Sequence, residues 1–235
     1  MVAGNGIGTV LNLTGGNSIA FSTPTFFPTA TTPITLEAWI KPSDIQDKEQ
    51  VGILGWDDAS APTNGARRIL MLRAEPDTGT VKGRKTIYFW GSSCDENPID
   101  ELSLDSSWNA NEWQHVAVTV TSNGFVTLYK NGNVILSKKS QPGCVLQDVP
   151  TNTPIFIGRR HFNQQSFTGL IDNARVYNTA LSSEEIMRHY IVENSLSQSI
   201  VPVPSSSGGN VLLSSNVKLS SNVRLRGSVQ PESQI

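Results

Sequence analysis

Apolar and polar residues alternate along several short segments of this chain. In residues 34–42 the apolar positions are Ile34, Leu36, Ala38 and Ile40, and the positions between them hold Thr35, Glu37, Trp39 and Lys41. A period of two is typical of a half-buried β-strand, because successive side chains point to opposite faces. The same alternation returns at Val116, Val118 and Val120. The hydrophobic pattern therefore predicts strands as the main elements.

Turn residues separate these segments into about eleven short strands, a number typical of a two-sheet sandwich. The predicted strands are residues 9–13, 18–21, 34–42, 51–56, 68–73, 85–90, 112–120, 125–130, 134–138, 154–159 and 167–177. The first two flank a Thr-Gly-Gly-Asn turn, and we expect them to pair as an opening hairpin. Residues 22–33, rich in Thr and Pro, predict a loop. Asn131-Gly132 predicts a second hairpin, because both central residues of its turn need positive φ.

Residues 167–177 predict a strand with one acid on its apolar face. One face of the extended chain would carry Leu170, Asp172, Ala174 and Val176, and the other would carry Ile171, Arg175 and Tyr177. A buried acid is costly unless it is hydrogen-bonded. We therefore expect Asp172 to accept hydrogen bonds from nearby backbone or hydroxyl donors.

A helix should follow this strand. Ser182 fits the N-cap position, Glu185 lies three residues later, and Leu181 is placed to pack on Ile186, which together form a helix-start signature. Residues four apart would press onto the strands below, and these pairs are Ile186 with Tyr190 and Met187 with Ile191. We expect the helix to close a β domain as a lid.

The order of these segments resembles a laminin-G-like domain of the concanavalin A-like lectin/glucanase class. The residues that carry the resemblance are Ile-Thr-Leu-Glu-Ala-Trp-Ile-Lys-Pro at 34–42, Glu-Trp-Gln-His-Val-Ala-Val-Thr-Val at 112–120, the hairpin at 125–136, the Ile-Gly strand at 154–159, and the Phe-x-Gly-x-Ile-Asp strand with its following helix at 167–190. The resemblance covers roughly residues 8–193. It implies an all-β jelly-roll sandwich of two sheets with one short C-terminal helix, in a family whose modules usually act outside cells.

The composition changes after Glu193. Residues 194–209 are rich in Ser, Pro and Gly and predict a linker, so we expect residues 1–193 to form the sandwich. Residues 210–235 begin an Asn-Val-x-Leu repeat with a period of six. Its apolar residues share one face of an extended chain, and they are Val211, Leu213, Val217, Leu219, Val223 and Leu225. Either this arm orders by pairing with a partner or with its own copies, or it is a disordered tail.

Charge and cysteine content narrow the classes of partner. The chain has 18 Lys and Arg against 20 Asp and Glu, for a net charge of -2, so the sequence predicts neither nucleic-acid binding nor membrane insertion. No apolar run approaches the ~20 residues of a membrane span, and the N-terminus lacks a signal-peptide pattern. Cys94 and Cys144 are interpreted as two separate thiols, with a disulfide as the alternative.

Jelly-roll folds also carry glycoside hydrolases, so a catalytic pair of carboxylates is one possible function of this sequence. Those enzymes place their acids two apart as Glu-x-Asp-x-Glu, so that the carboxylates point into one cleft, and this chain has no such run. The acidic residues at 95–105 lie in a predicted loop, where we expect water to solvate their side chains. His115, His161 and His189 show no metal-ligand spacing. The sequence therefore predicts no enzyme and no catalytic residue.

Ligand contacts are expected from loop residues beside strand ends, and the candidates are Trp56, Asp57, Asp58, Asn64, Trp108, His161 and Asn163. A tryptophan face would stack on a sugar while Asp or Asn fixes its hydroxyls. Core or rim packing is the simpler interpretation of Trp39, Trp90 and Trp113. No cofactor or metal is assigned; calcium held by Asp57 and Asp58, or by Asp95 and Glu96, is the alternative, although Asp more often makes turn hydrogen bonds.

These observations favour a non-catalytic interaction module that its arm anchors to a larger assembly. A fold used outside cells, no secretion signal and a strand-forming arm point to a virion surface, with the module on a bacteriophage capsid or tail, or to an extracellular location. The arm would join a protein partner or its own copies, as a trimer or a dimer. The alternatives are a free soluble lectin that binds a glycan and a glycoside hydrolase with atypical catalytic residues.

Overall fold

The computed structural model describes residues 10–13, 17–21, 24–44, 50–57, 68–74, 85–91, 108–139, 146, 148–160 and 166–199. Both cysteines, the acidic stretch 95–105 and the repeat arm lie outside these residues. The strands are β1 (Leu11–Leu13), β2 (Ile19–Phe21), β3 (Ile34–Pro42), β4 (Gln50–Trp56), β5 (Arg68–Ala74), β6 (Lys85–Trp90), β7 (Gln114–Val120), β8 (Phe125–Lys130), β9 (Asn133–Lys139), β10 (Ile155–Ile157) and β11 (Gly169–Tyr177). One helix, α1 (Ser183–Ser199), follows them.

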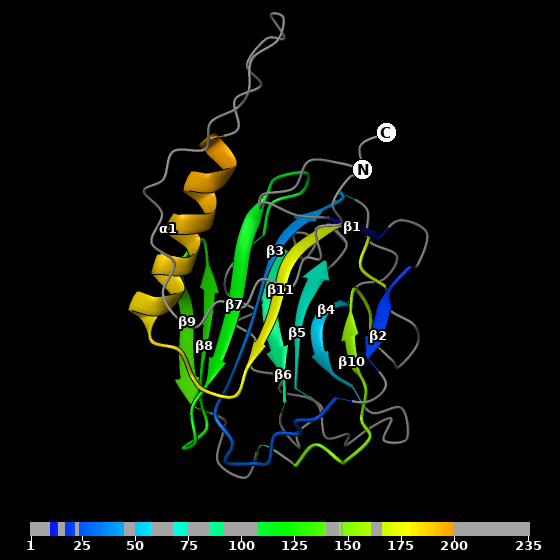
Figure 1. The fold of residues 1–235 in the computed structure, drawn as a ribbon, viewed down its shortest axis with the longest axis vertical. Helices are drawn as coiled ribbons and strands as arrows, with labels where there is room; N and C mark the ends of the chain where they lie inside the picture. The colour runs from blue at the N-terminus through cyan, green and yellow to red at the C-terminus, as the bar shows by residue number, and fades with distance from the viewer. Residues whose placement is uncertain are drawn as a thin grey trace, which may run out of the picture. The chain divides into compact units, whose positions relative to one another are not determined.

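The strands form two antiparallel sheets (Figure 1), as the sequence predicted. Sheet A has the order β1-β11-β3-β7-β8-β9, and sheet B has the order β2-β10-β4-β5-β6. Apolar side chains from the facing sides of both sheets form the main core, to which β3 contributes Ile34, Leu36, Ala38 and Ile40. Burial of such surface on both inner faces is what holds a sandwich together.

The outer face of β3 is also buried, which the half-buried pattern did not predict. Thr35 and Glu37 have no exposed surface, and Trp39 is 1% exposed. The reason is α1, which lies beside sheet A in Figure 1 and covers this face. The Asn131-Gly132 turn between β8 and β9 is confirmed, with φ of 50° and 76°.

The predicted opening hairpin is wrong. β1 pairs with β11 in sheet A, whereas β2 pairs with β10 in sheet B. Each of the two segments has three residues, and a hairpin that short buries too little surface to be stable alone. Each therefore extends a sheet built from longer strands, and the chain crosses from one sheet to the other between them. Residues 24–33 contain no strand, which confirms the predicted loop for the described part of 22–33.

The predicted faces of β11 are also wrong for part of the strand, because a β-bulge lies between Asp172 and Arg175. Asn173 adopts a φ of 48° there. Ile171, paired with Ile40, faces the core together with Val176. The extra residue of a bulge moves the following side chains to the other face. Asp172 consequently shares the outer face with Arg175 and Tyr177.

The polar surroundings of Asp172 agree with its expected hydrogen bonding, since Asn173 N–H donates to its Oδ1 at 2.8 Å. The carboxylate therefore has a backbone donor although the residue is only 7% exposed. The bulge supplies that donor from the next residue along the chain.

The start of α1 forms as predicted. Ser182 N–H donates to Glu185 Oε2 at 2.8 Å, and Glu185 N–H donates to Ser182 Oγ at 3.2 Å, which is a reciprocal capping box. Leu181 packs against the small cluster that contains Ile186. Ile186 is fully buried, whereas Ile191 is 53% exposed, so the predicted packing of Ile191 onto the domain is wrong.

The end of α1 lies beyond the predicted boundary at Glu193. The helix continues to Ser199, so residues 194–199 are helical and do not belong to a linker. Glu193 is 9% exposed and its side chain is bonded to sheet A, and Ser195 Oγ donates to Ile191 O within the helix. These contacts stabilise a helical turn in a sequence whose Ser content favoured irregular structure. The described helix has neither the length nor the apolar character of a bilayer span.

Candidate functional site

Three of the seven ligand candidates lie among the described residues, and all three are buried. Trp56, Asp57 and Trp108 each have no exposed surface. The remaining four candidates, Asp58, Asn64, His161 and Asn163, lie outside the described residues. The expectation that Trp56 and Trp108 each offer an open ring face to a sugar needs correction, because both rings pack into the core.

Asp57 and Trp108 have partners within the protein. The carboxylate of Asp57 lies 3.9 Å from Arg160 Nε, and both side chains are buried. Lys85 Nζ lies 4.9 Å from the centre of the Trp108 ring. Of the suggested calcium ligands, Asp58, Asp95 and Glu96 lie outside the described residues. The calcium alternative therefore stays a prediction.

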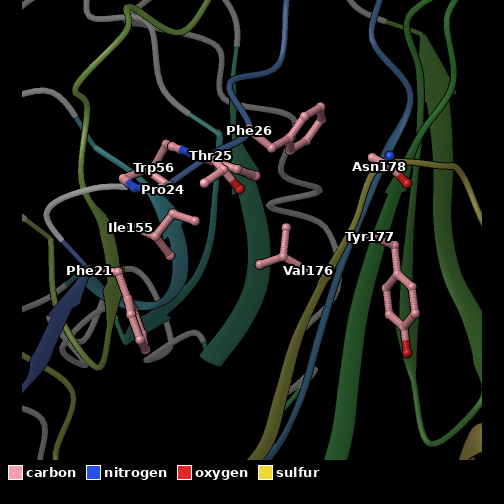
Figure 2. A pocket seen from close by; sticks show the side chains of 9 residues that line it. All are labelled: Phe21, Pro24, Thr25, Phe26, Trp56, Ile155, Val176, Tyr177 and Asn178. Carbon is pink, nitrogen blue, oxygen red and sulfur yellow. The ribbon is translucent and has the colours of Figure 1, made fainter. Parts of the chain in front are cut away.

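Trp56 lines a pocket at one end of the sandwich. The pocket has a volume of about 510 Å³, and its walls are formed by Phe21, Pro24, Thr25, Phe26, Trp56, Ile155, Val176, Tyr177 and Asn178. Figure 2 shows the side chains of Phe21, Phe26, Trp56, Ile155 and Val176 grouped together, with Tyr177 and Asn178 set apart from them. The lining residues come from strand ends and from the loop before β3, so the pocket is the open end of the core.

Strand pairing explains why the apolar wall is continuous. Ile155 at the start of β10 pairs with Phe21 on one side and with Trp56 on the other, so the three side chains form a row across sheet B. Val176 of β11 contributes from sheet A. The Phe26 ring meets the Trp56 ring edge-on, with centroids 5.8 Å apart. Phe21 is 51% exposed and lies at the mouth.

Tyr177 connects the pocket wall to a second feature, a buried charge cluster under α1. Figure 2 shows its ring pointing away from the aromatic group. Its hydroxyl donates to Glu37 Oε1 at 2.9 Å. Glu37 has no exposed surface. Burial and the carboxylate of Glu37 raise the pKa of Tyr177 well above its usual range, so the phenol stays protonated and remains a donor.

Glu37 collects donors from two other elements. Arg175 Nη1 on β11 lies 2.9 Å from its Oε1, and His189 Nδ1 on α1 lies 3.1 Å from both of its oxygens. His115 on β7 is buried, with Nε2 3.6 Å from Oε2, so that contact is electrostatic. Burial opposes the charge of Glu37, yet the two imidazoles hold its pKa well below its usual range.

The cluster extends to a second carboxylate. Glu193 near the end of α1 accepts from Trp39 Nε1, and its Oε1 lies 2.6 Å from Arg175 Nη2. Tyr190 stacks on Trp39 with centroids 5.7 Å apart. Arg175 therefore bridges an acid of the sheet and an acid of the helix. This arrangement attaches α1 to sheet A. The carboxylates of Glu37 and Glu193 are bonded to other residues of the same chain.

The sequence did not predict the cluster, although its residues carried a signal. Glu37 lies between Thr35 and Trp39 on a face that looks solvent-exposed if the strand is considered alone. The predicted lid helix requires a face to cover, and an acid next to tryptophan on a central strand is a candidate for that place. His189 and Glu193 follow the capping box at positions that return to the same side of the helix.

Comparisons with known proteins agree with this fold. The protein-family model for the concanavalin A-like lectin/glucanases superfamily matches residues 13–187. Among curated proteins no sequence matches the chain. Among solved structures, a heptameric SAP-like pentraxin from Limulus polyphemus has 15% identity and a TM-score of 0.50 over 72% of this chain and 73% of the pentraxin.

Two further structures are similar. A proposed carbohydrate-binding protein from Bacteroides ovatus has 19% identity and a TM-score of 0.51, over 73% of this chain and 43% of that protein. The binding domain of botulinum neurotoxin serotype D has 18% identity and a TM-score of 0.50, over 78% of this chain and 42% of the neurotoxin chain. The chain thus matches less than half of either. At these identities the likeness shows the fold, and with the family match over most of its length the chain belongs to the concanavalin A-like lectin/glucanases superfamily.

Proposed function

We propose that this chain is a non-catalytic binding module that presents the pocket at the end of its sandwich to a ligand. The pocket is the observation that carries the proposal. Its volume of about 510 Å³ lies within the roughly 300–1,000 Å³ typical of ligand sites, and its lining is mostly apolar and aromatic with a few polar groups, as in such sites.

The charge cluster supports a non-catalytic role. General acids and bases act on groups within hydrogen-bond reach of their carboxylates or imidazoles. The oxygens of Glu37 and Glu193 are instead engaged by Arg175, Tyr177, His189 and Trp39 of the same chain. These pairs hold the helix on the sheet and stabilise the wall of the pocket through Tyr177.

The superfamily offers counterparts for a binding role. The similar Bacteroides ovatus protein is a proposed carbohydrate-binding protein, and the similar neurotoxin domain is a binding domain. A free soluble lectin is the second candidate function, and it differs from the first in needing no assembly through the arm.

We also propose that residues 210–235 hold the module in an assembly on a surface, such as a virion capsid or tail. The hexad repeat supports this, because its apolar residues would share one face of an extended chain, and a single strand cannot cover such a face by itself. In a trimer or a dimer, the apolar Val and Leu residues of one arm would pack against those of another copy. The sandwich would then be displayed away from the point of attachment.

The binding proposal is tested with a panel of glycans and small ring compounds, offered to the full chain and to two variants. Asn178→Trp places a large ring at the pocket mouth, where Asn178 is exposed. Asn123→Trp adds the same ring at the exposed β7–β8 turn and serves as the matched control. We expect a ligand that binds the wild type and the control and loses affinity for Asn178→Trp.

Two outcomes contradict the proposal. One is a ligand whose affinity is the same for all three proteins, because the pocket is then not its site. The other is turnover of a polysaccharide by the wild-type chain, which would make the module an enzyme.

A further inference from the structure

We infer that the pocket takes a compact apolar ring compound that carries one hydrogen-bond acceptor, and that the indole N–H of Trp56 donates to this acceptor. The inference rests on the proposed function, because it names the ligand class of the same pocket.

The pocket wall contains a buried donor. Trp56 Nε1 is buried and has no hydrogen-bond partner among the described residues, although Trp56 lines the pocket. Buried polar groups in proteins are nearly always paired, and an exception asks for an explanation. A buried N–H without an acceptor is unfavourable. A ligand acceptor that reaches it therefore contributes more binding free energy than the same hydrogen bond would at an exposed site. A ligand acceptor in this pocket supplies the missing partner.

The apolar wall of the pocket comes from both sheets. Phe21, Ile155 and Trp56 form a row across sheet B, and Val176 contributes to the lining from sheet A. Packed sheets lie about 10 Å apart face to face, a separation that suits a planar or near-planar ring system. Aromatic side chains interact with such rings through their faces and edges, with centroids about 4.5–7 Å apart.

The polar lining groups fit such a ring compound better than a sugar. A sugar ring carries several hydroxyls, and each one that is buried needs a partner. The side chains of Thr25 and Asn178 are polar lining groups, while the Tyr177 hydroxyl is occupied by Glu37. Besides Trp56 the lining thus offers two polar side chains, fewer than the hydroxyls that a sugar ring presents. An apolar ring with one acceptor leaves none of its atoms unpaired.

Phe26 controls access to the donor. Trp56 exposes no surface, and the Phe26 ring packs edge-on against it. Phe26 is half-buried and lies in residues 24–33, which contain no strand. Turning this ring aside breaks no ladder hydrogen bond. Ligand entry therefore requires a side-chain movement in a loop and leaves both sheets intact.

The test uses nuclear magnetic resonance on the full 235-residue chain labelled with nitrogen-15. The indole N–H signal of Trp56 is assigned by its disappearance in Trp56→Phe. Three probes are titrated: acetophenone, which has a ring and one acceptor; ethylbenzene, which keeps the ring and the two-carbon chain and has no acceptor; and methyl β-glucopyranoside, a sugar. Asn178→Trp and Asn123→Trp serve as the blocked variant and its control.

We expect acetophenone to shift the Trp56 indole signal saturably in the wild type and in Asn123→Trp, and not in Asn178→Trp. Ethylbenzene should bind about tenfold more weakly, the factor for one hydrogen bond, and leave the indole proton shift nearly unchanged. The glucoside should produce no shift at the pocket.

Each contrary result overturns the inference in a different way. Equal affinity for acetophenone and ethylbenzene would show that the Trp56 indole N–H does not donate a hydrogen bond to the ligand. A shift caused only by the glucoside leaves the proposed function standing and replaces the ligand class. If no probe moves a pocket signal, the inference fails, and the glycan panel then decides the proposed function separately.

Discussion

His189 Nδ1 on α1 lies 3.1 Å from each carboxylate oxygen of Glu37 on β3. This contact joins residues 152 positions apart in the sequence, and it places an ion pair between the helix and the central strand of sheet A. The hydrogen bond to Glu37 raises the pKa of His189 against the effect of burial. The helix is therefore held by charge as well as by the packing of Ile186 and Tyr190.

Glu37→Gln should destabilise the domain by about 3 kcal/mol, because removing one member of a buried ion pair leaves its partners without compensation. The amide keeps the size of the side chain and removes its charge. Urea unfolding measures the change. Glu184→Gln, at an exposed position in the first turn of α1, is the control and should change the free energy of unfolding by less than about 0.5 kcal/mol. Equal losses in both variants would contradict the structural role of Glu37.

The pH dependence of stability should reflect the same pair. The pKa of His189 is raised above its ordinary value of 6.5, so its contribution is full below pH 6.5 and is lost as pH rises through the raised pKa. The pKa of Glu37 is lowered from 4.5, so its contribution is present above pH 4.5 and is lost as pH falls below that value. The pair should stabilise most between these values.

The measurement is the free energy of unfolding of the wild type and of His189→Asn at pH 5.5 and pH 8.5. His115 and the charges of Arg175 and Glu193 face the same site in both proteins, so the difference between them isolates His189. We expect the difference to be larger at pH 5.5. A difference that is the same at both pH values would show that His189 does not act through its charge.

Glu193→Gln should loosen the end of α1. The substitution weakens the pairing with Arg175 and with the Trp39 indole, while Ser182 and Glu185 still cap the start of the helix. Hydrogen exchange should become faster in residues 191–199 and stay unchanged in the first turn. Uniform acceleration along the helix would instead indicate that the helix detaches as one unit.

Two glycines allow the contact between α1 and the β8–β9 turn to be measured. Gly132 and Gly124 have φ of 76° and 81°, so alanine should cost about 1 kcal/mol of backbone strain at each. A Cβ at Gly132 would lie 2.8 Å from Met187 Sδ, whereas a Cβ at Gly124 meets nothing within 4 Å. Thermal unfolding should show a larger loss for Gly132→Ala. Equal losses would mean that Met187 moves aside freely.

The sequence was sufficient for the parts of the fold that depend on local pattern. The alternation in β3 and the Asn131-Gly132 turn predicted their elements correctly, and Ser182 with Glu185 predicted the start of α1. The bulge at Asn173 was not predictable in this way, because one residue in a left-handed conformation inverts the faces of the rest of the strand. The burial of Glu37 was missed because it depends on a helix almost 150 residues later.

The candidate site also combines a feature that the sequence predicts with features that it does not. The place of Trp56 at a strand end predicts a ligand contact. The structure puts the residue in the wall of a pocket, and the contact itself stays a prediction. The sequence did not reveal that the Trp56 ring is buried, since that depends on Phe26 from another segment and on the pairing of β4 with β10. The other lining residues come from strands that are distant in sequence and adjacent only in the sheets.

The central claim, a binding module held in an assembly by its arm, is tested most directly by the solution mass of the full chain. Light scattering compares the wild type with a full-length variant in which Leu213, Leu219 and Leu225 are all changed to Ser. We predict a dimer or trimer for the wild type and a monomer of 25.5 kDa for the variant, because the apolar face that copies share is then lost. A wild-type chain that is already monomeric, or a variant that remains oligomeric, would contradict the account.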